Sequence, residues 1–427
     1  MSDKVRIEKG WIWKLRQIYT INRLAAGIAM VSACVTPAQA QKFTVLYRFN
    51  NSDGAEPRSA LLRDSSGVLW GTAEYGGASG AGVVFKLRET GMETVLHSFN
   101  DAPDGARPFA SLLGARYGTT YTGGTNCNPP NSCGTVFKVD SNGKETVLYR
   151  FKGAPDGENS YGALIQDRKG NLYGTTVLGG DPNCDPPFGC GVVFKLDGSG
   201  KETVLYTFTG APDGDSPYGS LISDSAGNLY GTTSYGGVVN KACPIGCGVI
   251  YRLMQSSTGW KYKILHKFTG GLNGANPYDG LIRDTSGNLY GTTAAGGFRS
   301  HGTVFKLNSS FKLSLLYGFK GGADGSEPFA SLIRDSAGNL FGTTVFGGIK
   351  TTNCSDGCGT VFKIDPTGRK TILHAFIDAD GTSPYSGLLL DSAKRAIYGT
   401  ASLGGNFNCD AGHGDGPGCG TVFKIDY

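Results

Sequence analysis

Residues 171–197 read NLYGTTVLGGDPNCDPPFGCGVVFKLD, and nearly the same phrase recurs along the chain. It consists of an apolar run, a Gly-Gly pair, a Pro-rich insert that holds Cys184 and Cys190, and a second apolar run. Both runs are rich in β-branched and aromatic residues and are bounded by Gly, Asp and Asn, which is typical of strands joined by turns. The phrase therefore predicts two β-strands with a cysteine-closed loop between them.

A second phrase, TVLYRF at residues 44–49, marks the start of each repeat. Seven such starts are spaced roughly 50 to 60 residues apart, the other six beginning at residues 94, 146, 203, 263, 313 and 371. Each repeat holds four strand-like runs, and no segment after residue 40 has the period of a helix. Repeated four-stranded meanders that hide their edges by radial arrangement form a β-propeller.

The two ends of the repeat array are complementary. The array opens with a fourth-type strand at residues 44–49 and closes with a third-type strand, GTVFKIDY, at residues 420–427. A β-solenoid is the alternative architecture, but it does not need such complementary ends. We predict an all-β fold for residues 41–427: a seven-bladed propeller of four-stranded antiparallel blades, closed by the N-terminal strand.

The phrase GNLYGTT-x-x-GG followed by GTVFK resembles the GloVer tandem-repeat family and, more loosely, the two-component-regulator propeller repeat. The resemblance covers residues 44–427 and implies an exported propeller, but it implies no activity and supplies no catalytic residues. Two repeats depart from the pattern: residues 111–120 (SLLGARYGTT) lack the Asp turn, and residues 391–400 have Lys394 and Arg395 where Gly and Asn are usual. We expect the first hairpins of these two blades to be the least regular.

The first 40 residues differ from the rest of the chain. Six basic residues precede the apolar run LAAGIAMVSACV, and Ala38-Gln39-Ala40 has the small-residue form of a cleavage site, so residues 1–40 are predicted to be a signal peptide. Residues 31–34 (VSAC) resemble a bacterial lipobox, which makes a lipid anchor at Cys34 the second processing route. Either route predicts an exported protein, secreted, periplasmic or at the cell surface, with no transmembrane span in its mature chain.

All ten cysteines after residue 40 lie in five of the seven inserts, and the second of each pair precedes a Gly that opens a strand. This spacing predicts five local disulfides, since export permits oxidation. Zinc is the alternative, but each loop offers two thiols without a regular histidine pair, so we assign no metal. His97, His266 and His374 occupy a strand position held by Tyr in other repeats and are expected to pack there. The predicted pairs are Cys127–Cys133, Cys184–Cys190, Cys243–Cys247, Cys354–Cys358 and Cys409–Cys419.

Strand direction sorts the loops onto two faces. In an antiparallel blade the cysteine inserts and the blade-to-blade connections emerge together on what we call the loop face, and the tight Asp-Gly and Asn-Gly hairpins emerge on the plain face. The seven connections each contain Asp-Gly or Asn-Gly, either as ordinary turns or as oxygen ligands for calcium. Asp410 and Asp415 are the best-placed calcium candidates, but the spacing of a recognised calcium loop is missing. No cofactor is otherwise expected.

Binding sites usually lie on loops held by a rigid scaffold, so we place a ligand site on the loop face. Aromatic rings there could stack on a sugar or a peptide, or could pack between blades. The second interpretation is favoured by Leu178, Ala295 and Leu403, which occupy the same position in other repeats. The candidates, each one or two residues before a Gly-Gly pair, are Tyr75, Tyr121, Tyr235 and Phe346.

Charge and composition argue against two classes of function, nucleic-acid binding and catalysis. Without residues 1–40 the chain has 34 Lys plus Arg against 33 Asp plus Glu and no basic cluster, which argues against nucleic acid as a partner. The sequence shows no nucleophile with a base and no paired carboxylates that break the sevenfold pattern. We therefore expect a monomeric recognition module for a glycan, a peptide or an envelope protein. The alternative is a carbohydrate-active enzyme, either a glycoside hydrolase or a polysaccharide lyase.

Overall fold

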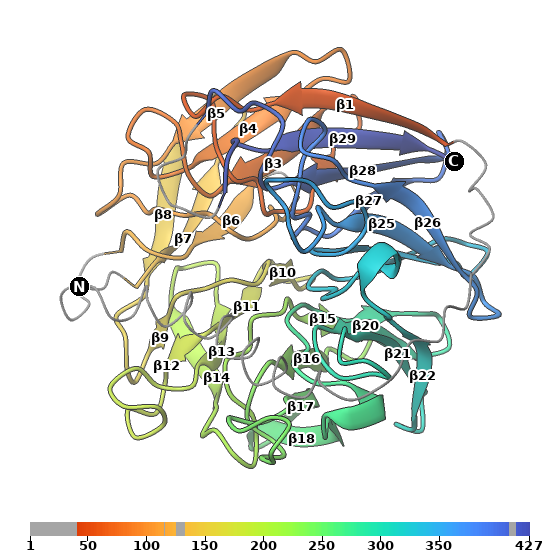
Figure 1. Ribbon diagram of the computed structural model, residues 1–427. Coiled ribbons are helices and arrows are strands. Elements are labelled where there is room, and N and C mark those ends of the chain that lie inside the picture. Colours follow the sequence, from red (N-terminus) through yellow and green to blue (C-terminus); the bar gives the residue numbers. More distant parts are fainter. Residues whose placement is uncertain (1–40, 115, 125–132, 410–415) are drawn as a thin grey trace. The chain divides into compact units, whose positions relative to one another are not determined.

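The computed structural model describes residues 41–114, 116–124, 133–409 and 416–427. These residues form seven antiparallel blades without an α-helix, which confirms the predicted all-β propeller (Figure 1). Within the described ranges no helix has the length and apolarity needed to cross a bilayer. The predicted signal peptide, including Cys34, lies outside the described residues.

Blades 1 to 3 follow one another along the chain. Their strands are β2 (Leu62–Arg63), β3 (Leu69–Ala73), β4 (Val83–Leu87) and β5 (Glu93–Ser98); β6 (Tyr117–Thr120), β7 (Thr135–Val139) and β8 (Glu145–Arg150); and β10 (Ile165–Gln166), β11 (Leu172–Thr176), β13 (Val192–Leu196) and β14 (Glu202–Thr207). A separate two-stranded ribbon pairs β9 (Gly157–Glu158) with β12 (Leu178–Gly179).

Blades 4 to 6 continue the same order. Their strands are β15 (Ile222–Ser223), β16 (Leu229–Thr233), β17 (Val249–Ser256) and β18 (Gly259–Lys267); β19 (Ile282–Arg283), β20 (Leu289–Thr293), β21 (Thr303–Leu307) and β22 (Leu313–Gly318); and β23 (Ile333–Arg334), β24 (Leu340–Thr344), β25 (Thr360–Ile364) and β26 (Lys370–Ala375). Two short 3₁₀ turns, η1 (Gly271–Asn273) and η2 (Gly322–Asp324), lie in the connections that follow blades 4 and 5.

Blade 7 joins the two ends of the array. It combines β27 (Leu389–Asp391), β28 (Ala396–Ala401) and β29 (Thr421–Asp426) with β1 (Lys42–Arg48), in the order β1-β29-β28-β27. β1 runs antiparallel to β29, with Lys42 opposite Asp426 and Arg48 opposite Thr421 (Figure 1). The prediction that the N-terminal strand closes the last blade is confirmed.

Neighbouring blades are joined by one aromatic contact repeated seven times. The Phe that follows each fourth strand packs edge-to-face on the aromatic ring in the third strand of the next blade, as Phe49 does on Phe85 at 5.1 Å between centroids. A Cβ at Gly71 would lie 2.6 Å from Phe85, which explains why glycine follows the aromatic residue in each second strand. The other pairs are Phe99–Phe137, Phe151–Phe194, Phe208–Tyr251, Phe268–Phe305, Phe319–Phe362 and Phe376–Phe423.

Blade 2 departs from the four-stranded pattern. It has three strands, in the order β6-β7-β8, and its first hairpin is reduced to a single bridge between Leu113 and Tyr117. In intact repeats the turn is built on an aspartate: Asp224 accepts hydrogen bonds from the backbone N–H groups of Ala226 and Asn228 and from the hydroxyl of Tyr230. The segment 111–120 has no such carboxylate, so its hairpin lacks the groups that order the turn.

Blade 7 keeps a regular first hairpin, contrary to the expectation from its altered turn, and its own Asp391 accepts the backbone N–H of Lys394 at 3.1 Å. β27 and β28 pair, although Lys394 and Arg395 replace the usual turn residues. Glu89 of blade 1 accepts hydrogen bonds from the Lys394 ammonium at 2.7 Å and from the Tyr398 hydroxyl at 2.9 Å. This contact also ties blade 7 to blade 1 on the plain face.

The Asp-Gly connections have the geometry of turns. In five connections the aspartate is hydrogen-bonded to a fourth-strand side chain, as Asp53 is to the Tyr47 hydroxyl at 2.7 Å; Asp53 also accepts from the backbone N–H of Asn50. Of the other two connections, one has Asn273 in place of aspartate, and in the other His97 lies 3.4 Å from Asp104. His374 takes the place of tyrosine beside Asp380, with 2.9 Å between Nε2 and Oδ2. The equivalent tyrosine pairs are Tyr149–Asp156, Tyr206–Asp213 and Tyr317–Asp324.

Three glutamates at the start of fourth strands face the aspartate of the preceding connection. Burial, followed by the charge of Asp53, raises the pKa of Glu93 to about 7. Burial and Asp104 raise the pKa of Glu145 to about 8, and burial and Asp156 raise that of Glu202 to about 7. At the equivalent position of blade 6 a cation is present instead, since Lys370 lies 2.9 Å from Asp324.

These glutamates predict a stability that falls as pH rises. Between about pH 4.5 and about pH 8 the unfolded chain has released protons that the folded protein still holds, so the free energy of unfolding decreases across this window. The triple variant Glu93→Gln/Glu145→Gln/Glu202→Gln should flatten this dependence, measured by urea denaturation at several pH values. Asp101→Asn, an exposed acid, is the matched control. An unchanged slope in the triple variant would contradict the assignment.

Candidate binding site at the axis of the loop face

Each blade-to-blade connection leads into a residue with an uncommon backbone conformation. Seven non-glycine residues at equivalent positions have φ between 53° and 59°, a left-handed conformation that non-glycine side chains rarely adopt. Such conformations persist where the surrounding structure fixes them, and they are concentrated at functional sites. These residues are Glu56, Arg107, Asn159, Ser216, Asn276, Glu327 and Ser383.

The backbone of each of these residues is held by the preceding blade. Its N–H donates to the carbonyl of the residue that ends the preceding insert, and in five blades that residue is the second cysteine of a predicted pair. The donors and acceptors are Glu56 to Cys419, Asn159 to Cys133, Ser216 to Cys190, Asn276 to Cys247 and Ser383 to Cys358, at 2.9 to 3.1 Å. In the two remaining blades Ala81 and His301 supply the carbonyl.

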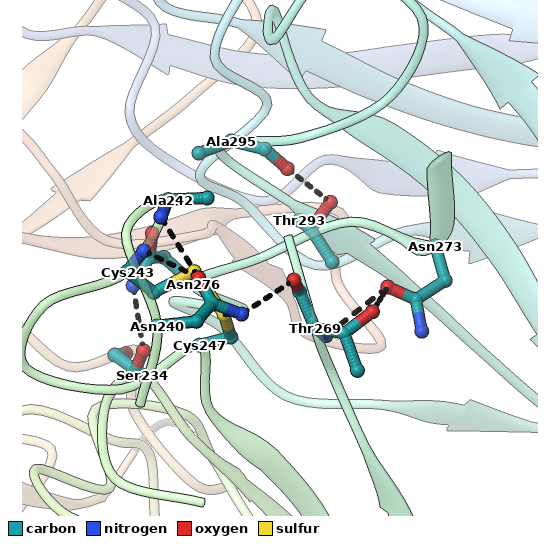
Figure 2. The surroundings of a disulfide bond; sticks show 10 residues. All are labelled: Ser234, Asn240, Ala242, Cys243, Cys247, Thr269, Asn273, Asn276, Thr293 and Ala295. Carbon is teal, nitrogen blue, oxygen red and sulfur yellow. Dashed lines mark hydrogen bonds between the residues drawn. A yellow bond between two sulfur atoms is a disulfide. The ribbon is translucent and has the colours of Figure 1, made fainter. Parts of the chain in front are cut away.

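Figure 2 shows this arrangement at blade 4. The disulfide Cys243–Cys247 closes the insert, and the side-chain amide of Asn276 donates to the carbonyl of Ser234 at 2.9 Å. Asn240 fixes the other end of the insert, because its side chain accepts from the backbone of Cys243 and donates to the carbonyl of Thr269. The disulfide thus secures a loop whose last carbonyl positions a residue near the axis.

Four of the five predicted disulfides are present: Cys184–Cys190, Cys243–Cys247, Cys354–Cys358 and Cys409–Cys419. Their Cα–Cα distances are 5.1 to 5.6 Å, within the usual range. Cys127, the partner predicted for Cys133, lies outside the described residues, as do Asp410 and Asp415. Among the described residues the one group spaced to hold a metal is Cys354, Cys358 and Asp378, and its two sulfurs are bonded to each other.

Two residues beyond each left-handed residue, seven side chains form a closed ring around the axis. Their members are Arg58, Phe109, Tyr161, Tyr218, Tyr278, Phe329 and Tyr385, which we call the axial ring. Consecutive aromatic centroids are 4.1 to 5.7 Å apart. The Arg58 guanidinium completes the circle, 5.0 Å from the Tyr385 ring and 5.7 Å from the Phe109 ring, within the range of cation–π attraction.

A charged cluster interrupts the sevenfold pattern at blades 1 and 2. Arg58 lies 2.7 Å from Glu56 and 3.0 Å from Glu74, and Arg107 lies 2.9 Å from the other oxygen of Glu74. Both glutamate side chains are only 1% exposed, so their charges depend on these partners. Burial opposes the charge on Arg58, but Glu74 and Glu56 outweigh it and raise the pKa of Arg58 above its usual value. We call Glu56, Arg58, Glu74 and Arg107 the axial charge cluster.

Comparisons with known proteins agree with this architecture. A family profile described as the Gloeobacter/Verrucomicrobia repeat matches residues 33–243 and 185–413. The chain belongs to this repeat family. The comparison with curated proteins returned no match.

Several solved structures are similar to this Gloeobacter/Verrucomicrobia repeat protein at low sequence identity. The extracellular domain of the putative one component system BT4673 from B. thetaiotaomicron is 10% identical with a TM-score of 0.53; the match covers 91% of this chain and 40% of that one. XC5397 from Xanthomonas campestris, described as a gluconolactonase, is 13% identical with a TM-score of 0.42, over 90% of this chain and 89% of that one. A protein of unknown function from Dyadobacter fermentans is 12% identical with a TM-score of 0.44, over 91% of this chain and all 100% of that one.

Three of the four aromatic residues singled out from the sequence touch the axial assembly of this repeat protein. The Tyr75 hydroxyl is hydrogen-bonded to Arg107, and the Tyr235 hydroxyl to that of Tyr278. Tyr121 packs edge-on against Phe109 and Tyr161 of the axial ring. It occupies the repeat position of Glu74, one residue before that of Tyr75. Phe346 pairs through its backbone with Ser326.

The axial ring and the axial charge cluster were not predicted from the sequence. The available signal was one triplet in each connection, with proline at its centre in six repeats, as in Glu56-Pro57-Arg58, and serine in the seventh, Asn159-Ser160-Tyr161. Aligning the seven triplets places Arg58 against six aromatic residues, which marks it as the exception. Aligning the position of Glu74 in the same way gives Tyr121, Val177, Ser234, Ala294, Val345 and Ser402, so Glu74 is the one charged residue at that repeat position. The sequence does not show that the packed blades bring Glu74 within reach of both arginines.

Removing Arg58 should destabilise the protein, because Glu56 and Glu74 are buried beside it. We expect Arg58→Ala to lower the free energy of unfolding by about 3 kcal/mol, because breaking a buried ion pair leaves an uncompensated charge. The triple variant Glu56→Gln/Arg58→Ala/Glu74→Gln should lose less, since the buried charges are removed together. Urea denaturation measures both. Equal losses in the single and triple variants would contradict the ion-pair role.

The disulfide at blade 4 should stabilise both the fold and the axis. Cys243→Ala/Cys247→Ala should cost about 2 kcal/mol by the chain-entropy estimate for so small a ring. Amide hydrogen exchange at Asn276 should become faster, because its acceptor is the carbonyl of Cys247. Thr352→Ala, an exposed substitution in another insert, is the control. An unchanged exchange rate at Asn276 would show that the disulfide does not fix the backbone of this residue.

Proposed function

We propose that this protein is an exported recognition module that binds a glycan through the axial charge cluster and the neighbouring axial ring. The observation that carries the proposal is the asymmetric group of Glu56, Arg58, Glu74 and Arg107 on an otherwise sevenfold scaffold. A purely structural axis could repeat one packing residue seven times. Buried ion pairs are weak sources of stability, which supports a functional reason for their presence.

The chemistry of the axis suits a sugar. Half-buried tyrosines of the axial ring, such as Tyr161 and Tyr218, offer an apolar face and a hydroxyl on one side chain. Arginine and carboxylate groups beside them supply hydrogen-bond donors and acceptors in fixed directions. A saccharide presents both apolar ring faces and many hydroxyls, so it matches this combination better than an extended apolar peptide does.

Export is supported by the four disulfides, since such bonds persist in oxidising compartments. In this proposal the stapled inserts set the position of the left-handed residues and thus the shape of the axial site. Residues in such backbone conformations are often preorganised for binding. The partner would be a glycan outside the cytoplasm, at the cell surface or in the envelope.

A carbohydrate-active enzyme is the second candidate, because Glu56 and Glu74 form a pair of buried carboxylates at the axis. Glycoside hydrolases use two carboxyl groups, one of which must be protonated to act as an acid. Here both glutamates are held in ion pairs within the protein, Glu56 with Arg58 and Glu74 with Arg58 and Arg107. This arrangement favours binding over hydrolysis.

Binding to an array of purified polysaccharides tests the proposal. We expect retention of the protein on one class of glycan without new chain ends, and a loss of affinity of at least about tenfold in Tyr161→Ala/Tyr218→Ala. Met92→Ala, on the plain face, is the matched control. Retention that survives the double substitution, or no retention at all, would overturn the axial site.

The same polysaccharide array tests the second candidate function, a carbohydrate-active enzyme. Released fragments that disappear in Glu74→Gln would assign hydrolysis or elimination to the cluster in place of recognition. Circular dichroism of each variant must match that of the parent protein, so that lost binding is not lost folding.

A further inference from the structure

Exposed apolar side chains are concentrated on one part of the loop face. Nine large hydrophobic side chains of the described residues are exposed, and seven of them lie in inserts or connections of blades 4 to 7. The other two are Met92, in a turn on the plain face, and Leu315, on the fourth strand of blade 5. The seven are Val239, Ile245, Leu272, Phe298, Ile349, Ile377 and Phe407.

The inserts of blades 4, 5 and 6 place cations beside these apolar side chains. Phe298, which is 74% exposed, is followed by exposed Arg299, and Ile349, which is 46% exposed, is followed by exposed Lys350. In blade 4 exposed Lys241 lies two residues after Val239. Within the same three inserts the sequence contains a single acid, Asp356. We call Val239, Lys241, Phe298, Arg299, Ile349 and Lys350 the basic apolar rim.

Members of the basic apolar rim lie at related places in consecutive blades. Phe298 follows the pair Gly296-Gly297, and Ile349 follows Gly347-Gly348, so the two residues occupy one repeat position. Blades 4, 5 and 6 are successive sectors of the propeller (Figure 1). Side chains at one repeat position of neighbouring blades emerge on the same face, where a single flat partner can touch all three inserts.

We propose that the basic apolar rim binds the surface of an anionic lipid bilayer. Apolar side chains enter the boundary between headgroups and acyl chains, and neighbouring cations are attracted to the lipid phosphates. The positive charge of the basic apolar rim favours an anionic bilayer as its partner. Such a bilayer is flat and offers both negative headgroups and apolar chains to each of the three inserts. A dimer formed through this surface is disfavoured, because the cations of one basic apolar rim would face those of the other.

The inserts and connections of blades 1 to 3 carry more acidic than basic groups. They contain the exposed acids Asp101 and Asp185 and the half-buried Asp181, against one exposed cation, Lys152. An anionic membrane repels this side, so the propeller would lie tilted with blades 4 to 6 against the lipid. The axial charge cluster would then remain accessible beside the membrane.

Vesicle co-sedimentation tests the proposal. The exported protein is used with Cys34→Ala in every variant, so that no acyl chain contributes. We expect binding to vesicles that contain phosphatidylglycerol, weak binding to phosphatidylcholine alone, and a loss that grows with salt concentration. Phe298→Ser/Ile349→Ser and Arg299→Gln/Lys350→Gln should each weaken binding by at least about tenfold. These positions are exposed, so folding should be unchanged by circular dichroism.

Met92→Ser is the matched control, because Met92 is 61% exposed on the plain face. No binding to phosphatidylglycerol vesicles would overturn the proposal, and so would an equal loss in Met92→Ser. Light scattering without lipid supplies the third outcome: a doubled mass that returns to that of a monomer in Phe298→Ser/Ile349→Ser would assign the rim to a second copy of this chain and overturn the lipid assignment.

Discussion

The pairing of β1 with β29 is the interaction on which the rest of the molecule depends. It joins residues from opposite ends of the chain, Lys42 opposite Asp426, and brings blade 7 against blade 1. Arg58 lies between Tyr385 and Phe109 only because these two blades are neighbours. The completion of the axial ring and the Glu89 contacts to blade 7 therefore follow from closure.

The disulfides also help to position the residues around the axis. Each closes an insert whose final carbonyl accepts the N–H of a left-handed residue in the next blade. The short inserts of blades 1 and 5 make this bond without cysteines, because few residues separate the Gly-Gly pair from Ala81 or His301. A long insert has more freedom, which a disulfide removes. The cysteines thus accompany long inserts because the axis needs a fixed carbonyl.

Function on this scaffold depends on departures from symmetry. Sevenfold packing gives each blade the same edge-to-face aromatic contact and the same buried second strand. Charges are distributed unevenly on top of this repeat: the axial charge cluster is confined to blades 1 and 2, and the basic apolar rim to blades 4 to 6. The proposed glycan site lies at the axis of the loop face and the proposed lipid site at its rim, so the two proposals do not compete for one surface.

Repetition within the sequence determined the fold class, the blade number, the closure of the ring, the placement of loops on two faces and the four observed disulfides. Those features depend on local strand and turn chemistry and on counting repeats, which one sequence contains in full. Only the tertiary structure decided that blade 2 has lost a strand, that Glu89 contacts Lys394 and Tyr398 of blade 7, and that Glu56 and Glu74 share Arg58. Such contacts join residues of different blades, and their energies depend on burial and distance, which a sequence does not state.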